Sequence, residues 1–224
     1  VLDPVMYLIN NHTPGLNETM ALFRRSLINK GVMTLENMMA LRTCTPLTED
    51  DRLEFSSDVS FVGHFESDGR LEVCEALLSR GIDLKIFGPY KGLGKSGWHG
   101  HIKDSSPIKQ QTPLRFLNGN EYVKALSGTK IALCFLSKLN RDTYTRRCFE
   151  IPACGAALFS EYSDDLGELY KEGQEAEFFR SQDELIEKVD FYLRSHHGYY
   201  QWVVGCKSID LLDLLRMRQQ IQYR

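Results

Sequence analysis

DVSFVGHFESDGRLEVCEALLSRGIDLKIF, residues 58–87, is the stretch that decides the fold. It begins with a short β-rich run, 58–62, and residues 70–80 then carry apolar side chains at helical spacing. Gly81 follows as a left-handed helix cap, and 84–87 is a second β-rich run. The pattern predicts a strand, its crossover helix and a second strand, which is the unit of a parallel sheet.

The same alternation continues towards the carboxyl end. The pattern predicts helices at 121–126 and 145–154, strands at 130–136, 156–159 and 175–179, and a helix from the capping box at Ser181 and Glu184 to about residue 196. Strands that alternate with amphipathic helices predict an α/β fold: a Rossmann-like parallel sheet with flanking helices.

The ends of the chain do not share this rhythm. Residues 1–56 read as a helical amino-terminal segment, a remnant or linker with helices at 17–30 and 34–42. We expect the α/β domain to span 57–200, and 201–224 to form an amphipathic helix that packs on a neighbouring domain. A chain of 224 residues is short for two complete α/β domains.

Composition narrows the class of protein. A formal net charge of −3 argues against a nucleic-acid partner, which would need clustered Lys and Arg, so we expect a small-molecule partner. The longest apolar run, 151–159, is too short to span a bilayer, and we expect a cytoplasmic protein. The six cysteines form no C-x-x-C pair and read as small core side chains.

Two motifs suggest other chemistry. The glycines of 92–97 (GLGKSG) match a dinucleotide fingerprint, and Lys95 resembles the lysine of a phosphate-binding P-loop. The glycine spacing does not fit a P-loop, and residues 98–107, which follow, are a poor helix former, so we favour a surface loop. A P-loop kinase or an NAD-dependent sugar epimerase stays a rival interpretation. His99 and His101 lack a third ligand at a suitable spacing and Asp-x-Asp is absent, so we predict no metal site.

The informative stretch is YTRRCFEIPACG, residues 144–155, which follows the strand predicted at 130–136. An open parallel sheet binds ligands at the carboxyl ends of its strands, where this stretch begins. Arg147 precedes Glu150 by one helical turn, so both side chains are expected on one face. The Arg147 guanidinium can hold a diphosphate with two parallel hydrogen bonds, and the structural alternative is an ion pair between Arg147 and Glu150.

Several segments together resemble a known family. They are DVSFVG at 58–63, the stretch 122–133, R-x-FEIPACG at 147–155, and EGQEAEFF at 172–179 before S-x-x-EL at 181–185. In order and spacing they are similar to the carboxy-terminal domain of the CgeB-like (spore-maturation-type) glycosyltransferases, over about residues 57–200. The resemblance implies a GT-B fold, in which two Rossmann-like domains face each other and the carboxy-terminal one binds a nucleotide sugar.

The resemblance also implies an activity: transfer of a sugar from a nucleoside-diphosphate donor, first of all a UDP-sugar, to an unknown acceptor without a cofactor or a metal. Glu150 is then expected to accept hydrogen bonds from the ribose hydroxyls. Asp142 precedes Glu150 by the spacing of the paired acids of many retaining GT-B enzymes, but the first acid there is usually Glu. The acceptor's general base is expected from a second domain, and a homodimer is a further expectation.

The remaining candidate binding residues lie around the expected sheet edge. The loop 63–69 contains His64 and leads into the helix that Arg70 begins, whose free amides and positive dipole end suit a phosphate. The other candidates are Gly63, Gly88, Asn118, Gly119, Arg146 and Gly155. The loop 116–119 is expected to contact the base. The rival from another class is a non-catalytic Rossmann-like module that senses a nucleotide sugar or docks a partner.

Overall fold

The computed structural model describes residues 47–91, 97–117 and 119–194. The helices expected at 17–30 and 34–42, and the helix expected in 201–224, lie outside the described residues.

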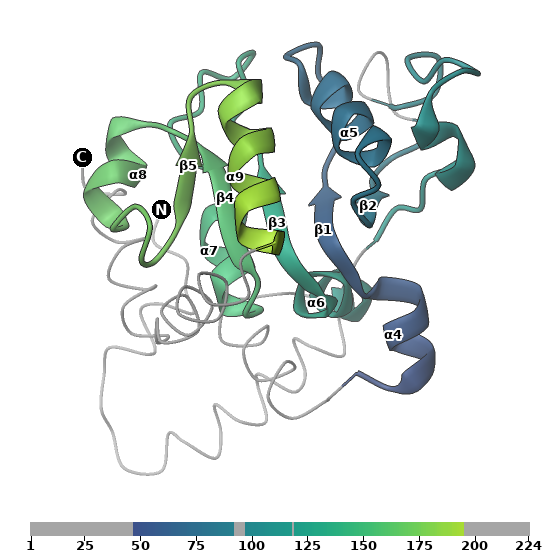
Figure 1. Cartoon of the computed structure of the whole chain (residues 1–224), viewed down its shortest axis with the longest axis horizontal. Coiled ribbons are helices and arrows are strands. Elements are labelled where there is room, and N and C mark those ends of the chain that lie inside the picture. The colour runs from purple at the N-terminus through teal and green to yellow at the C-terminus, as the bar shows by residue number, and fades with distance from the viewer. Residues whose placement is uncertain (1–46, 92–96, 118, 195–224) are drawn as a thin grey trace, which may run out of the picture.

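Five parallel strands form one sheet in the order β2-β1-β3-β4-β5 (Figure 1). The strands are β1 Ser57–Val62, β2 Leu84–Phe87, β3 Thr129–Cys134, β4 Ala157–Glu161 and β5 Glu177–Phe179. In the register, Val59 lies opposite Leu84 of β2 and Ile131 of β3. The chain builds outward from β1 in one direction and from β3 in the other. The strand order therefore reverses between β1 and β3, and a crevice at the carboxyl ends of these two strands is the usual ligand site of such a sheet.

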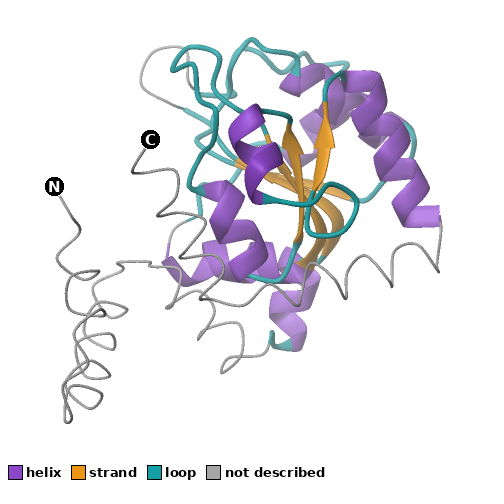
Figure 2. Ribbon diagram, turned by 90° about the vertical axis from the view of Figure 1, so that its left-hand side faces the viewer, coloured by secondary structure: helices purple, strands orange, loops and turns teal. Residues whose placement is uncertain are grey.

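Helices cover both faces of the sheet (Figure 2). They are α4 Glu49–Phe55, α5 Arg70–Ser79, the 3₁₀ turn η1 Pro107–Gln111, α6 Gly119–Gly128, α7 Arg147–Ala153, α8 Asp164–Leu169 and α9 Gln182–Arg194. On one face, α5 and α9 pack on buried strand side chains such as Phe61, Leu133 and Phe159. On the other face, α7 and α8 pack on Cys134 and Leu158. The core thus lies on both sides of the sheet, as fully buried parallel strands require.

The predicted α/β alternation is confirmed. The strands expected at 58–62 and 84–87 and the helices expected at 70–80 and 181–196 are present within two residues of their observed bounds. The strand expected at 130–136 ends at Cys134, and the edge strand expected at 175–179 is shorter, because residues 173–175 form a turn before β5.

Three short elements were not predicted: α4, η1 and α8. The signal for α4 was in the sequence, since Thr48 and Asp51 form a capping box in which each side chain accepts from the other's amide. Helix α8 is six residues long and contains Gly167, so its pattern is too short to show a helical period. Ser163 caps it by accepting from the Leu166 amide.

The described cysteines behave as expected for core side chains. Cys74, Cys134, Cys148 and Cys154 are buried and free. Among the described residues, no helix has the length and apolar character that crossing a membrane requires.

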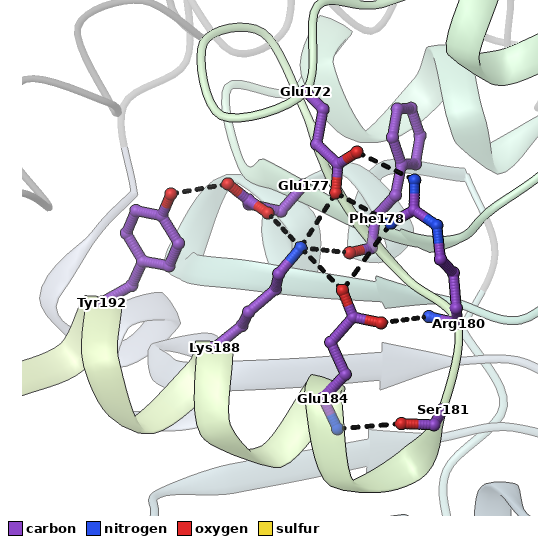
Figure 3. A network of polar contacts seen from close by, with 8 residues as sticks. All are labelled: Glu172, Glu177, Phe178, Arg180, Ser181, Glu184, Lys188 and Tyr192. Carbon is purple, nitrogen blue, oxygen red and sulfur yellow. Dashed lines mark hydrogen bonds and ion pairs between the residues drawn. The ribbon is translucent and has the colours of Figure 1, made fainter.

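A network of charged side chains ties β5 to α9 (Figure 3). Lys188 Nζ lies 2.9 Å from carboxylate oxygens of both Glu172 and Glu177 and 3.1 Å from Glu184. Arg180 donates two hydrogen bonds to Glu172, at 3.1 and 3.0 Å. Each acid shares a cation with another acid, so the edge strand is held to the last described helix by several linked ion pairs rather than by one.

Candidate nucleotide-binding site at the carboxyl edge of the sheet

The point where the strand order reverses brings predicted site residues together. Gly63 and His64 directly follow β1, Asp142 lies in the loop after β3, and α7 begins after this loop with Arg147. The loops after β1 and β3 both lie at the upper edge of the sheet in Figure 1. The topology therefore gathers at one edge residues that are some 80 positions apart in the sequence.

Glu150 is a buried carboxylate with a protein donor on each oxygen. Its side chain is 8% exposed. Tyr122 Oη donates to Oε2 at 2.7 Å, and Arg146 Nη2 donates to Oε1 at 2.7 Å. Two donors compensate its burial, and since a carboxylate offers about four acceptor positions, it keeps capacity for further donors.

Arg147 does not pair with Glu150. The ion pair considered as the structural alternative is taken instead by Arg146, four residues before Glu150, as helical geometry favours. Within the described parts of the chain, the half-buried Arg147 guanidinium makes no hydrogen bond or ion pair. Burial and then the Glu150 carboxylate raise the pKa of Tyr122 well above its ordinary value, and Arg147 acts in the opposite direction, so its charge lies near this pair. The site thus holds a cation that no described residue neutralises.

The loop after β1 is organised around Arg70, and it differs from the expected phosphate cradle. The Arg70 side chain is 2% exposed, and its guanidinium donates to Asp68 at 2.5 and 2.8 Å and to the His64 carbonyl at 2.8 Å. It also lies over the rings of Phe61 and Phe135. Arg70 therefore holds the loop from inside and does not face a ligand, contrary to the prediction.

The amino terminus of α5 is also occupied. The Asp68 carboxylate, 3% exposed, accepts from the Arg70 amide at 3.3 Å and so lies where a phosphate was expected. Glu66 is buried beside it, and its Oε1 lies 2.7 Å from His64 Nε2. A phosphate at this terminus would meet buried negative charge. Two residues of this loop reach solvent: the His64 side chain is 39% exposed, and Ser67 is exposed.

Gly63 and Gly88 are close-packing positions at the ends of β1 and β2. A Cβ on Gly88 would lie 2.0 Å from the Gly63 carbonyl oxygen and 3.0 Å from Trp98 Nε1. Trp98 Nε1 donates to this same carbonyl at 3.0 Å, and the Trp98 side chain is fully buried. The two glycines therefore let the loop around Trp98 close on the sheet, which accounts for them without a ligand.

The other predicted site residues do not all lie at the same edge of the sheet. Asp142 lies at the carboxyl edge, where its amide donates to the Ser137 carbonyl at 3.0 Å. Gly119, with φ of +52°, starts α6, while Asn118 lies outside the described residues. Gly155 follows α7 and precedes β4, which places it at the opposite edge. Its φ of +79° is the left-handed value that favours glycine after a helix, so a backbone reason suffices for Gly155.

The rival motifs offer no competing cluster in the described part of the chain. Residues 92–96 of the glycine-rich loop lie outside it. His101 stacks on Phe65 with ring centroids 3.7 Å apart, and His99 meets Tyr90 edge to face. Over residues 47–91, 97–117 and 119–194, no three His, Cys, Asp or Glu side chains form a group that could hold a metal ion.

A hollow of about 460 Å³ lies beside α8 and β5, and its lining includes Tyr162, Tyr170, Phe178 and Arg180. None of the predicted site residues lines it. The Arg180 guanidinium lies over the Tyr162 ring, 4.1 Å from its centroid. Arg180 and Glu172 belong both to the lining of the hollow and to the charged network around Lys188.

Sequence reasoning missed Tyr122, Glu66 and Asp68. Tyr122 is 28 residues from the carboxylate that it contacts, so no local spacing connects the two. Asp68 carried a detectable signal, since an acid two residues before a helix start is a common partner for the first amides.

The comparisons with known proteins concern the family and the fold of this chain. A model of the glycosyl transferase-like family matches residues 70–199, more than half of the chain. A search of curated proteins finds no match. Among solved structures, the chain is similar to Anabaena HepE in complex with UDP and glucose, with a TM-score of 0.55 and 12% identity over 79% of this chain and 52% of that one.

A second similar structure is the C-terminal domain of the glycosyl transferase group 1 family protein LpcC from Francisella tularensis. The TM-score is 0.52 at 14% identity, over 80% of this chain and 97% of that domain. At such identities the similarity shows the fold, which is the carboxy-terminal Rossmann-like domain of the GT-B type. The chain spans about half the length of HepE. On the family match and on this fold, the chain belongs to the glycosyl transferase-like family.

Proposed function

We propose that this chain is the donor-binding half of a GT-B glycosyltransferase of the CgeB-like group. It binds a nucleoside-diphosphate sugar, with a UDP-sugar as the first candidate, at the carboxyl edge between β1 and β3. The observation that carries the proposal is the pairing of Glu150 with Arg146 and Tyr122, which leaves Arg147 without a described partner one turn away. HepE, which shares the fold, has been solved with UDP-glucose, and this supports a uridine donor.

In this proposal the two side chains divide the donor between them. Glu150 has acceptor positions left beyond its two protein donors, and these receive the vicinal ribose hydroxyls. The planar Arg147 guanidinium donates two parallel hydrogen bonds to the diphosphate. The Arg147 cation offsets part of the diphosphate charge, and in this proposal the donor binds without a metal.

The reaction that fits this site is sugar transfer to an acceptor hydroxyl. The bond between the anomeric carbon and the diphosphate oxygen breaks, the acceptor oxygen bonds to the same carbon, and its proton passes to a base supplied by a second domain. Negative charge grows on the departing diphosphate, and Arg147 stabilises that charge in the transition state.

Calorimetric titration of the purified chain with UDP, GDP and dTDP, in EDTA and again with magnesium, tests the donor site. The proposal predicts binding of one nucleotide in EDTA and at least about tenfold weaker binding by Glu150→Ala, since a charged hydrogen-bond acceptor is lost. Glu187→Ala, which removes an exposed carboxylate from α9, is the matched control and should bind like the parent. Absence of binding by the parent, or equal binding by Glu150→Ala, would contradict the proposal and favour the interaction module.

A further inference from the structure

Tyr122 and Glu150 join two helices at the candidate site. Tyr122 lies in the first turn of α6 and Glu150 in the first turn of α7. The phenol oxygen lies 2.7 Å from Glu150 Oε2. Burial and then the Glu150 carboxylate raise the pKa of Tyr122 well above its ordinary value. The phenol therefore stays protonated over the physiological range, and it is the donor in this bond.

A carboxylate held in this way cannot turn freely. The last torsion of a Glu side chain is normally broad, so an unanchored carboxylate samples many orientations. Here Tyr122 fixes Oε2 and Arg146 fixes Oε1, and rotation would break both bonds. The two anchors are unequal, because the Arg146 side chain is 72% exposed and its bond competes with water, whereas the phenol is half-buried.

We propose that Tyr122 is a positioning residue that makes the donor site selective for ribonucleotides. By fixing the Glu150 carboxylate, it aims the remaining acceptor positions at the two ribose hydroxyls at once. A site built to receive a hydroxyl discriminates against an analogue without it, because its buried acceptor is left unpaired. Preorganisation strengthens this effect, since the bound geometry exists before the ligand arrives. The inference rests on the proposed donor site and adds to it the group that enforces sugar selectivity.

The test compares two ligands on two variants. The probes are UDP or GDP, whichever the parent binds more tightly, and the 2′-deoxy form of the same nucleotide. For the parent we expect about tenfold weaker binding of the deoxy form, the effect of one lost hydrogen bond to a charged group. The quantity compared is the ratio of the Kd of the deoxy form to the Kd of the ribonucleotide. For Tyr122→Phe, which keeps the ring, we expect this ratio to fall about threefold or more, because the ribonucleotide binds more weakly and the deoxy form changes little.

Controls separate positioning from general damage. Tyr144 lies just before α7 and packs on Phe149, and its phenol makes no hydrogen bond with the described residues. Tyr144→Phe should therefore keep the parent's ratio. If Tyr122→Phe does not fold, Arg146→Ala loosens the same carboxylate from its exposed side and should lower the ratio about twofold. Any contact of Arg146 with a phosphate cancels in this ratio, because both ligands carry the same diphosphate.

The outcomes are distinguishable. A smaller ratio for Tyr122→Phe supports the inference. An unchanged ratio, whether both affinities fall equally or neither changes, overturns the positioning role and leaves the donor site standing. A parent that binds neither UDP nor GDP overturns the donor-site proposal, and the inference with it.

Discussion

Glu150 accepts a hydrogen bond from Arg146, at 2.7 Å, while the adjacent Arg147 lies beside this pair without bonding to it. The two arginines are neighbours in the sequence and both stand at spacings that allow contact with Glu150, but the residue four places before the acid makes the bond. One arginine is thereby committed to the protein, and its neighbour stays available at the edge where the strand order reverses.

Arg147→Ala is expected to weaken binding of a nucleoside diphosphate by about tenfold or more and to have little effect on the unphosphorylated nucleoside, because the guanidinium contacts the diphosphate. Arg146→Ala should weaken both ligands to a similar, smaller extent, since it acts through Glu150. Calorimetry with UDP and uridine measures both effects. Arg80→Ala, at the far end of α5, is the control for loss of one arginine. Equal losses for Arg146→Ala and Arg147→Ala would contradict the assigned division of roles.

Arg70→Leu should destabilise the fold by about 3–5 kcal/mol, because it leaves the buried Asp68 and Glu66 carboxylates without their cation. Urea unfolding of the parent, Arg70→Leu and Arg80→Ala gives the comparison. Arg80→Ala removes an exposed arginine and should lower the free energy of unfolding by less than about 0.5 kcal/mol. A cost for Arg70→Leu as small as that of Arg80→Ala would show that the buried cluster does not hold the loop.

Gly88→Ala should cost about 1–3 kcal/mol or more, because its Cβ would overlap the backbone carbonyl of Gly63, which is also the acceptor for Trp98. Gly81→Ala is the contrasting variant, since nothing lies within 4 Å of its Cβ and it bears the strain of a φ of +77° alone, about 1–2 kcal/mol. Thermal unfolding of both variants and the parent tests the packing. A Gly88→Ala variant as stable as the parent would refute the close approach.

The Glu172 carboxylate should make stability depend on pH in the acid range. Hydrogen bonds from Arg180, and less strongly from Lys188, lower its pKa from 4.5 to about 2. A carboxyl whose pKa is lowered by folding stabilises the protein above its unfolded pKa, and this contribution is lost as pH falls from about 4.5 towards about 2.

Glu172→Gln therefore should lose about 1 kcal/mol at neutral pH, after allowance for screening of a side chain that is 35% exposed, and its difference from the parent should shrink below about pH 4. Urea unfolding at a series of pH values measures this, with Glu187→Gln as the control. High salt should reduce the difference. A difference between parent and variant that does not vary with pH would rule out the assigned ion pairs as its source.

The fold was predictable because its signals are local. Residues 58–87 show apolar side chains at the spacing of strands and at the spacing of a helix, and Ser181 begins a capping box. These signals depend on neighbours within a few positions, and the structure has the strands and helices that they predict. Helix α8 escaped prediction because Tyr162–Leu169 is too short for a period, and its cap contact with the Thr143 carbonyl comes from another loop.

The sheet edge at which the candidate residues lie was predictable from the sequence, but their contacts were less so. The carboxyl edge follows from strand order, but the partner of each charged group depends on distances that the sequence does not contain. Arg70 was expected to face a ligand, and a buried Asp68 two residues earlier turns it inward. The contact of Tyr122 with Glu150 has no local sequence signal, because the two residues lie on different helices.

The most direct test of the central claim is a crystal structure of the chain with the tightest-binding nucleoside diphosphate. We expect the ribose hydroxyls within hydrogen-bonding distance of the Glu150 carboxylate, and the diphosphate on Arg147, at the carboxyl edge between β1 and β3. A nucleotide bound instead at Lys95 or in the hollow beside Tyr162, with Glu150 and Arg147 untouched, would contradict it.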